Sequence, residues 1–216
     1  MEFCGKLTRH IDYNISYGEY KHFVVRVSVI EDIRRIVKKH QPSAADPKHS
    51  DRSRAAVLIP LIDDAVVRIL LTERAGALSA HGGEVALPGG REDEDDGSSR
   101  VTALRETEEE IGVVPAQVEV IGELQPFVSK YGLLVTPVVG IIPAGLQYEP
   151  SPDEIAAIFE VPLDFFRTAK PVRIDELNRQ GEFNRVPAYD YQGYEIWGLT
   201  ALIISELLQV IGSAEH

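Results

Sequence analysis

Leu87–Val113 reads LPGGREDEDDGSSRVTALRETEEEIGV. In this segment two glycines follow a proline, and an acidic loop comes next. A helix is expected from Ser98 to Glu110, with Gly112 ending it. Glutamates crowd the second half of that helix, and such a concentration of carboxylates marks it as a candidate for chemistry.

The glutamates fall together on one side of this helix. At about 100° per residue, Glu106, Glu109 and Glu110 have the i, i+3, i+4 relation that brings side chains close to one another. The opposite, apolar side is expected to carry Val101, Leu104, Thr107 and Ile111. A run of charges usually indicates only a solvated face, and that is the plain interpretation of these residues.

The position of the three glutamates argues against a merely solvated face. Like-charged neighbours repel, and anions in the last turn oppose the helix dipole, so without a cation the arrangement costs about 1–2 kcal/mol. Mg²⁺ or Mn²⁺ would turn it into a site of hard oxygen ligands. The Gly89-Gly90 turn can add backbone carbonyls, because residues without Cβ permit close approach. We therefore expect a divalent-metal site that also holds substrate phosphates.

The whole chain is predicted to divide into two parts. Residues 1–50 are weakly patterned apart from an amphipathic helix that begins near Val29, and they are predicted to be an N-terminal extension. The polar segment 41–54 has the character of a linker and places a boundary near Asp51. Residues 51–212 are then the main domain. The extension could pack on that domain or pair with another subunit, which leaves a homodimer open.

Runs of branched apolar residues indicate strands in the main domain. Residues 55–61 and 65–72 flank Asp63-Asp64 and predict a hairpin. Further strands are expected at 118–124, at 133–142 and around 155–161, and a last helix at Leu199–Ile211, ended by Gly212. This order of elements is α+β.

Composition disfavours several classes of partner. A net charge of −12 argues against a nucleic acid polymer, whose binding draws on basic patches. Small phosphorylated substrates remain compatible, because bound cations can reverse the sign of an acidic pocket. The longest apolar stretch, 133–146, is too short to cross a membrane. The amino terminus lacks a secretory signal and Cys4 is the single cysteine, so we expect a cytoplasmic protein.

Residues 105–113 resemble the second half of the Nudix box, GX5EX7REUXEEXGU, in which U is aliphatic. This chain reads RETEEEIGV there, and the one departure is Thr107 in an aliphatic position. The first half is stretched by one residue, since Gly90 lies 15 positions before Arg105. Asp96 occupies the place of the usual glutamate.

A Nudix box that is stretched by one residue and carries aspartate in place of glutamate is similar to the box of the coenzyme A diphosphatase branch of the Nudix family. That branch carries LLTxR(S/A)x3Rx3Gx3FPGG upstream, and this chain reads LLTERA at 70–75, Gly83, and LPGG at 87–90. Ser79 replaces the second arginine of the pattern, and Leu87 replaces its phenylalanine. Similar stretches occur at TALRE (102–106), VTPVVG (135–140) and IWGLTA (196–201), so the resemblance covers most of residues 54–205.

The resemblance implies a Nudix α/β/α sandwich with a mixed sheet and a carboxylate-bearing helix. It implies a hydrolase dependent on Mg²⁺ or Mn²⁺ that splits the diphosphate of coenzyme A or its thioesters. The products would be 4′-phosphopantetheine, or its acyl form, and adenosine 3′,5′-bisphosphate. By carry-over, Glu106, Glu109 and Glu110 are metal ligands together with a carbonyl of Gly90, and Arg105 holds the carboxylates or Asp96 in place.

Four further residues are candidates for the site. Glu154 could supply a metal ligand or the general base, or it could be a surface glutamate. Arg74 suits a phosphate contact because guanidinium pairs with phosphate oxygens in a fork, although it could instead brace the helix. His81 could contact phosphate or the attacking water, or it could support a turn. Gly89 is expected beside the substrate.

Two other functions compete with coenzyme A hydrolysis. Ser79 and Leu87 keep open a Nudix enzyme that acts on another small diphosphate, such as ADP-ribose or a dinucleotide. A non-catalytic Nudix-fold binding module is the third hypothesis. Three mutually repelling carboxylates argue against it, because such a module would have no need of them.

Overall fold

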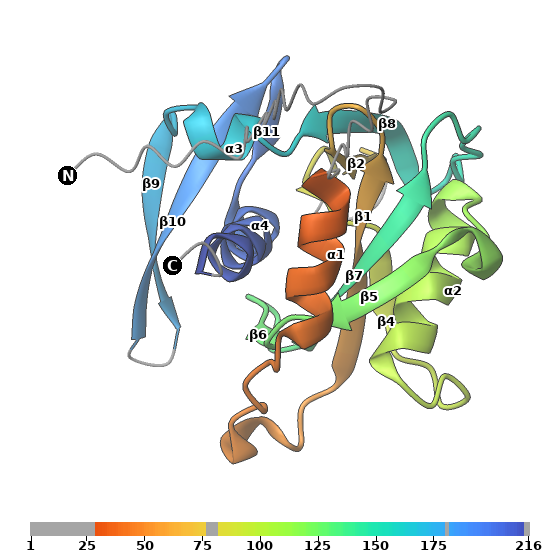
Figure 1. Ribbon diagram of the computed structural model, residues 1–216. Helices are drawn as coiled ribbons and strands as arrows, with labels where there is room; N and C mark the ends of the chain where they lie inside the picture. The colour runs from red at the N-terminus through yellow and green to blue at the C-terminus, as the bar shows by residue number, and fades with distance from the viewer. Residues whose placement is uncertain (1–28, 77–81, 180–181, 214–216) are drawn as a thin grey trace, which may run out of the picture.

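The computed structural model describes residues 29–76, 82–179 and 182–213 (Figure 1).

Two central strands of the main sheet pair with each other only near the turn that joins them and then separate. The strands concerned are β1 (Arg54–Asp63), β2 (Arg68–Arg74), β3 (Val85–Ala86) and β4 (Gly89–Arg91). Beyond the β1–β2 hairpin, β4 pairs with β1 and β3 pairs with β2. The glycine segment therefore lies in the gap between the two strands, where the Leu58 N–H donates to the Pro88 carbonyl at 2.8 Å.

The remaining strands complete a mixed sheet. β7 (Leu134–Pro143) runs parallel to β1 along its whole length. Three strands pair antiparallel with their neighbours: β5 (Glu119–Glu123) and β6 (Phe127–Val128) with β7, and β8 (Ile155–Pro162) with β2. The predicted hairpin and the three further predicted strands are confirmed within a few residues.

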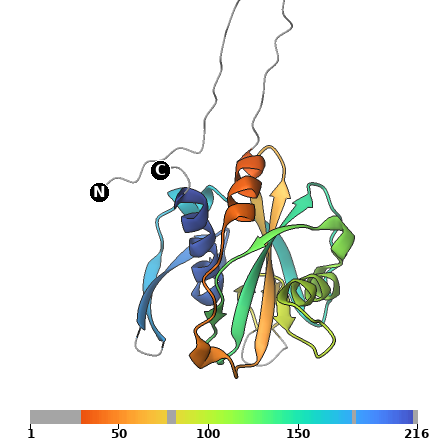
Figure 2. The same ribbon diagram turned by 60° about the horizontal axis from the view of Figure 1, so that its bottom comes forward.

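Helices cover both faces of this sheet. Helix α2 (Ser99–Ile111) lies on one face, and α1 (Val29–Lys39) and α4 (Gly198–Gly212) lie on the other (Figure 2). Strand β1 contributes side chains to a hydrophobic core on each face. Leu58 packs in the cluster that contains Ala103 of α2. Ile59 packs in the cluster that contains Ile33 of α1 and Leu207 of α4. The predicted α/β/α sandwich is confirmed.

The amphipathic helix of the predicted extension packs against the main domain. Ile30, Ile33 and Val37 are buried in the core shared with α4. On its outer side Arg34 and Lys38 both bind Glu119 of β5, at 3.0 and 2.9 Å. The helix is confirmed, while the division into residues 1–50 and 51–212 stays a prediction. Two short 3₁₀ turns, Pro47–His49 and Pro115–Gln117, lie in the connections.

A second, three-stranded sheet is not predicted from the sequence. It consists of β9 (Arg173–Arg179), β10 (Glu182–Tyr191) and β11 (Tyr194–Ile196), in the order β11-β10-β9. The short helix α3 (Phe165–Thr168) precedes it, and Phe165 stacks edge-on against Tyr189 and Tyr191 of β10. Charged residues interrupt the apolar alternation of these strands, so their local signal is weak.

The last helix differs in one detail from the prediction. Gly212 was expected to end α4, but it lies within the helix and Ser213 is the cap. None of the helices in the described ranges is long and apolar enough to cross a membrane.

Candidate active site

Two glycines let the chain pass between β1 and α2. Gly89 has a φ of 149°, and a Cβ there would overlap the backbone of Ala56 and Val57. A Cβ at Gly90 would overlap the carboxylate of Glu106. These glycines lie in strand β4 and not in the predicted turn, but their backbone lies directly against a carboxylate of the helix, as the close approach predicted from the glycines requires.

Helix α2 has well-defined ends. Ser98 caps its start by accepting the Val101 N–H at 3.3 Å. Gly112 caps its end in the left-handed conformation, with a φ of 74°, and donates to the Glu108 carbonyl at 2.9 Å. Thr107, the departure from the aliphatic position, is fully buried and donates its hydroxyl to the Ala103 carbonyl at 2.6 Å. Its polar atom is thus satisfied inside the core.

The predicted division of this helix into an apolar and an acidic side is wrong in part. Thr107 and Ile111 are buried as expected, but Val101 is 45% exposed. Glu110 is only 2% exposed and lies on the buried face. The Glu110 carboxyl can be buried here because partners from outside the helix bind it.

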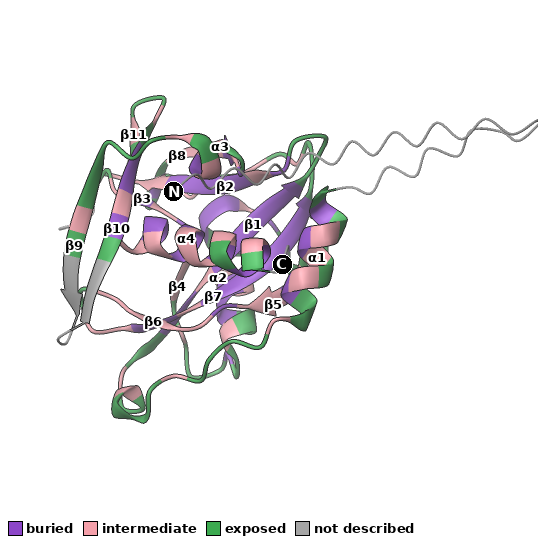
Figure 3. Ribbon diagram, turned by 60° about the vertical axis from the view of Figure 1, so that its left-hand side comes forward, coloured by how far each residue is buried: buried purple, intermediate pink, exposed green. Residues whose placement is uncertain are grey.

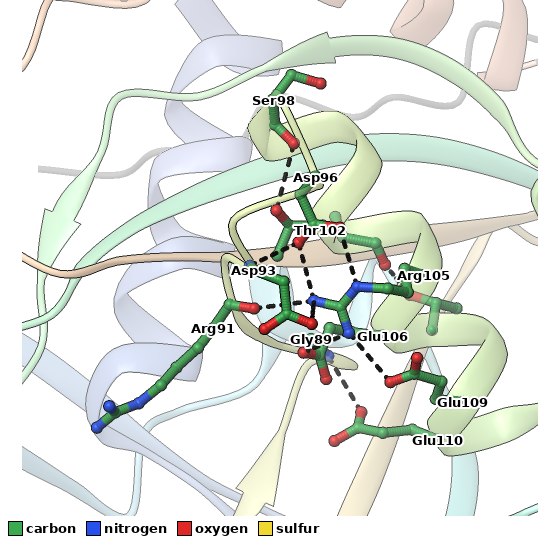
Figure 4. Close-up of polar contacts among 12 residues, drawn as sticks. Gly89, Arg91, Asp93, Asp96, Ser98, Thr102, Arg105, Glu106, Glu109 and Glu110 are labelled. Atoms are coloured by element: carbon green, nitrogen blue, oxygen red, sulfur yellow. Dashed lines mark hydrogen bonds and ion pairs between the residues drawn. The ribbon is translucent and has the colours of Figure 1, made fainter.

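Arg105, in the middle of α2, binds acidic groups of the preceding loop and of the second half of the helix (Figure 4). Its Nε and Nη2 each donate to one oxygen of Asp96 at 2.9 Å, and Nη2 also donates to the Arg91 carbonyl at 2.9 Å. Its Nη1 donates to Glu106 Oε1 at 3.0 Å and to Glu109 Oε2 at 3.1 Å. The predicted role of holding Asp96 and the carboxylates is what this geometry allows.

Asp96 is the buried anchor of that network. It also accepts the Asp93 N–H at 2.9 Å, and only 4% of its side chain is exposed. The Arg105 guanidinium holds the pKa of Asp96 well below its usual range, and the hydrogen bonds to Asp96 in turn raise the pKa of Arg105. Asp93 and the Arg91 carbonyl were missed from sequence, because nothing in the motif indicates which loop groups turn toward the arginine.

Glu110 has a separate set of partners. The Gly89 N–H donates to its Oε2 at 3.1 Å, and Arg74 Nη1 lies 3.5 Å from its Oε1. Burial raises the pKa of Glu110 to about 7, and the bond from Gly89 only partly offsets this effect. Burial likewise raises the pKa of Glu106. Arg74 is therefore placed against the helix, with 32% of its side chain still exposed.

Glu154 lies on a turn that is tied to the end of α2. The Ser151 N–H donates to the Glu110 carbonyl and the Glu149 N–H to the Ile111 carbonyl, both at 2.9 Å. Glu154 is exposed, and its charge contributes to the raised pKa of both Glu106 and Glu110. The fold therefore brings Glu154 to the same end of the site as the helix carboxylates.

The donor set suits a hard divalent cation. Glu106, Glu109 and Glu110 with the Gly90 carbonyl offer oxygen ligands of the kind that Mg²⁺ and Mn²⁺ prefer. Within the part of the chain that the structure describes, no three acidic, histidine or cysteine side chains form a group that could hold a metal as they stand. Arg105 engages Glu106 and Glu109, and Gly89 and Arg74 engage Glu110, so these oxygens would have to exchange partners.

The buried carboxyl of Glu110 should make the metal-free protein less stable as pH rises. The folded state keeps its proton up to about pH 7, whereas the ordinary value is 4.5. Its contribution is therefore fully present below about pH 4.5 and is lost as the pH rises through 7, by about 3 kcal/mol. Urea unfolding with a chelator at pH 5, 6, 7 and 8 measures this trend. Glu110→Gln should flatten it, and an equal slope in that variant would contradict the assignment.

Comparison with known proteins places this arrangement in a family. Residues 52–179 match the NUDIX domain family. The chain is 45% identical over 163 residues to "Uncharacterized Nudix hydrolase NudL" of Photorhabdus laumondii, covering 75% of this chain and 87% of that protein. It is 43% identical over 171 residues to "Nudix hydrolase 15, mitochondrial" of Arabidopsis thaliana, covering 76% and 60%. The protein belongs to the Nudix family.

Solved structures of Nudix proteins are also similar. A MutT/nudix family protein from Enterococcus faecalis has a TM-score of 0.48 and 18% identity, covering 89% of this chain and 73% of that one. An Ap4A hydrolase from C. elegans has a TM-score of 0.45 and 18% identity, covering 51% and 81%.

The protein is accordingly a hydrolase of the diphosphate bond in a nucleoside diphosphate derivative. Nudix hydrolases generally use divalent metal ions. Two residues that the motifs single out, His81 and Ser79, lie outside the described residues. The individual roles assigned from sequence stay predictions.

Proposed function

We propose that this protein hydrolyses the diphosphate of coenzyme A or its thioesters, releasing 4′-phosphopantetheine, or its acyl form, and adenosine 3′,5′-bisphosphate. The observation that carries the proposal is the stretched box in which Asp96 replaces glutamate. The Asp96 side chain receives both Nε and Nη2 of Arg105. This pair of bonds, the arginine clamp, holds Arg105 although the box carries a shorter carboxylate and one extra residue, so the altered box can serve as a working variant.

The upstream motif supports the same branch. Arg74 of the LLTERA segment ends β2 and reaches Glu110, while Gly89 and Gly90 of LPGG border the helix. Leu87, which replaces the phenylalanine of the pattern, is 4% exposed and packs in the core. That departure concerns packing. Ser79 remains the departure that bears on substrate binding.

We assign roles to the site residues on this basis. Glu106, Glu109 and Glu110 with the Gly90 carbonyl would hold Mg²⁺ or Mn²⁺, which when bound would orient the diphosphate, offset its charge and activate water. Arg105 positions Glu106 and Glu109, and Glu154 is the candidate general base. Arg74, His81 and the Gly89 backbone are the candidate contacts of the substrate.

The charge of the site explains why cations are needed. Glu106, Glu109, Glu110 and Glu154 are faced in the described structure by Arg105 and Arg74, and Arg105 is already bound to Asp96. A diphosphate brings further negative charge, so its approach is repulsive until divalent ions reverse the local sign.

Coenzyme A should be hydrolysed faster than ADP-ribose. A charge-assisted hydrogen bond to its 3′-phosphate contributes about 1.5–3 kcal/mol, or roughly ten- to a hundredfold in discrimination. The measurement is kcat/KM for both substrates with Mg²⁺ and with Mn²⁺, together with identification of the products. Release of adenosine 3′,5′-bisphosphate supports the proposal. Rapid turnover of ADP-ribose with little attack on coenzyme A would leave only the general Nudix assignment.

Ser79 allows a finer test of the same preference. If serine has removed a contact to the 3′-phosphate, selection against dephospho-coenzyme A should be weak, and Ser79→Arg should strengthen it. No response to Ser79→Arg would assign that recognition to another group, such as Arg74.

Gly90→Ala should lower turnover while the fold survives. The added Cβ would overlap the Glu106 carboxylate, which is the mobile end of a side chain and can move aside. A displacement of about 1 Å in a catalytic group can cost roughly a hundredfold in rate. Gly212→Ala is the matched control, because a Cβ there meets nothing within 4 Å. Equal turnover in the two variants would show that activity does not depend on the position of the Glu106 carboxylate.

A further inference from the structure

Strand β9 is the outer edge of the three-stranded sheet, and exposed aliphatic side chains lie on it and immediately before it. In the described structure β9 pairs with β10 alone. Val172 and Ile174 are 62% and 50% exposed, and Figure 3 shows this strand at the margin of the molecule. Edge strands that stay monomeric are normally kept short, bulged or charged, because their open backbone groups can pair with another chain.

The backbone groups of Ile174 point away from β10. The ladder partner of Ile174 is Pro187, which has no N–H to donate. Antiparallel partners alternate between hydrogen-bonded and non-bonded pairs, so the Ile174–Pro187 pair is a non-bonded one. The N–H and C=O of Ile174, and by the same alternation those of Glu176, therefore face the open edge.

We propose that two copies of this chain dimerise by pairing β9 antiparallel to itself, with Ile174 on the two-fold axis. Each open N–H and C=O of Ile174 then bonds to the partner's Ile174. The two three-stranded sheets become one continuous six-stranded sheet, which is the isologous contact expected of a symmetric dimer. The aliphatic side chains of Ile174 and the partner's Ile174 lie side by side and cover one another.

The charges of the strand select this register. With Ile174 on the axis, Arg173 lies opposite the partner's Asp175, and Asp175 lies opposite the partner's Arg173. Sliding the strands by two residues, which keeps the backbone groups in phase, places Arg173 opposite the partner's Arg173 or Asp175 opposite the partner's Asp175. Like charges directly opposite one another destabilise a sheet, and opposite charges stabilise it.

A second copy fits this edge better than an unrelated strand would. Arg173 already binds Asp175 within the chain through Nε, at 2.9 and 3.1 Å, and its Nη1 binds Glu195 of β11. The strand therefore presents alternating charges that are ordered before a partner arrives. Because the pattern is complementary to its own antiparallel copy, the matching partner is the chain itself.

The contact is short, so a weak dimer is expected. Residues 172–176 overlap in this register, but the Val172 N–H already donates to the Ala188 carbonyl at 2.8 Å, so regular backbone pairing is confined to the residues around Ile174. Interfaces this small are weak and transient. Sedimentation velocity of the full chain between about 1 and 500 µM should show reversible dimerisation in that range. A sedimentation coefficient of a monomer at every concentration would overturn the proposal.

Ile174→Lys tests whether Ile174 lies on the two-fold axis of the dimer. It places two ammonium groups side by side at the two-fold axis and should raise the dissociation constant at least tenfold. Val66→Lys is the matched control, since Val66 is 54% exposed in the β1–β2 turn and should leave the constant unchanged. Thermal unfolding of both variants establishes that they are folded. Equal dimerisation of Ile174→Lys and the wild type would place the interface elsewhere.

A disulfide tests the register independently. In a Cys4→Ser background, Ile174→Cys should form a cross-linked dimer on mild oxidation, because facing Cα atoms in such a pair lie about 5.5 Å apart, within disulfide range. Glu176→Cys is the control, since its copies would be about 14 Å apart, four residues along the strand. Cross-linking of Glu176→Cys but not Ile174→Cys would rule out this register.

Discussion

Glu109→Gln should lower turnover by about a hundredfold or more, equivalent to about 3 kcal/mol in the activation barrier. A neutral amide is a poor substitute for a metal-binding carboxylate, so the charge that holds the cation against the diphosphate is lost. The fold should be unaffected, because the Glu109 side chain is 59% exposed and its contact is the 3.1 Å ion pair with Arg105. The unfolding midpoint is expected to stay within about 2 °C of the wild type.

Steady-state kinetics with coenzyme A and a thermal melt measure the two halves of this prediction. Glu108→Gln is the control, since Glu108 is exposed and next to Glu109 on the helix but points away from Glu106 and Glu110. It should behave like the wild type. Near-normal turnover of Glu109→Gln, or activity that survives chelation, would make the metal assignment wrong.

Arg105→Gln should have the largest effect on stability. It removes the counterion of Asp96, whose side chain is 4% exposed, and leaves a charge buried without its partner. Breaking such a pair costs about 3–5 kcal/mol, which for a protein of this size is a fall of roughly 10 °C in the unfolding midpoint. Arg100→Gln changes an exposed arginine on the same helix and should move the midpoint very little.

The pH dependence of stability distinguishes a broken ion pair from general damage. In the wild type the folded pKa of Asp96 is lowered, so its contribution is present above about pH 4 and is lost on acidification. In Arg105→Gln the buried carboxyl lacks its guanidinium, its pKa rises, and acidification toward pH 4 should recover stability. Adding Asp96→Asn should restore part of the loss at pH 7. Additive losses in the double variant would contradict the clamp.

Local signals in the sequence suffice to predict the elements that build the site. Ser98 and Gly112 are good caps, so the ends of the carboxylate helix follow from short-range chemistry. The same holds for the β1–β2 hairpin, where apolar runs flank two aspartates. The close approach at Gly89-Gly90 is also predictable, because glycine is required wherever another chain segment approaches the backbone this closely, but the segment is strand β4 and not the expected turn.

The second sheet is not predictable in the same way. β9 and β10 carry charged residues along their length, and their docking depends on aromatic contacts between Phe165 and two tyrosines far along the chain. Such contacts have no signature within a short window of sequence. The proposed dimer edge therefore follows only from the order of the strands in space.

Sequence by itself determined the family, the helix and the set of carboxylates, because these depend on residue types at fixed spacing. Only the tertiary structure decided which carboxylate is buried. Periodicity placed Glu110 on the polar side, yet it lies inside with Gly89, 21 residues away, and Arg74, 36 residues away, as its partners. The cost of burying a charge depends on the groups that surround it, and these come from strands that the helix sequence does not encode.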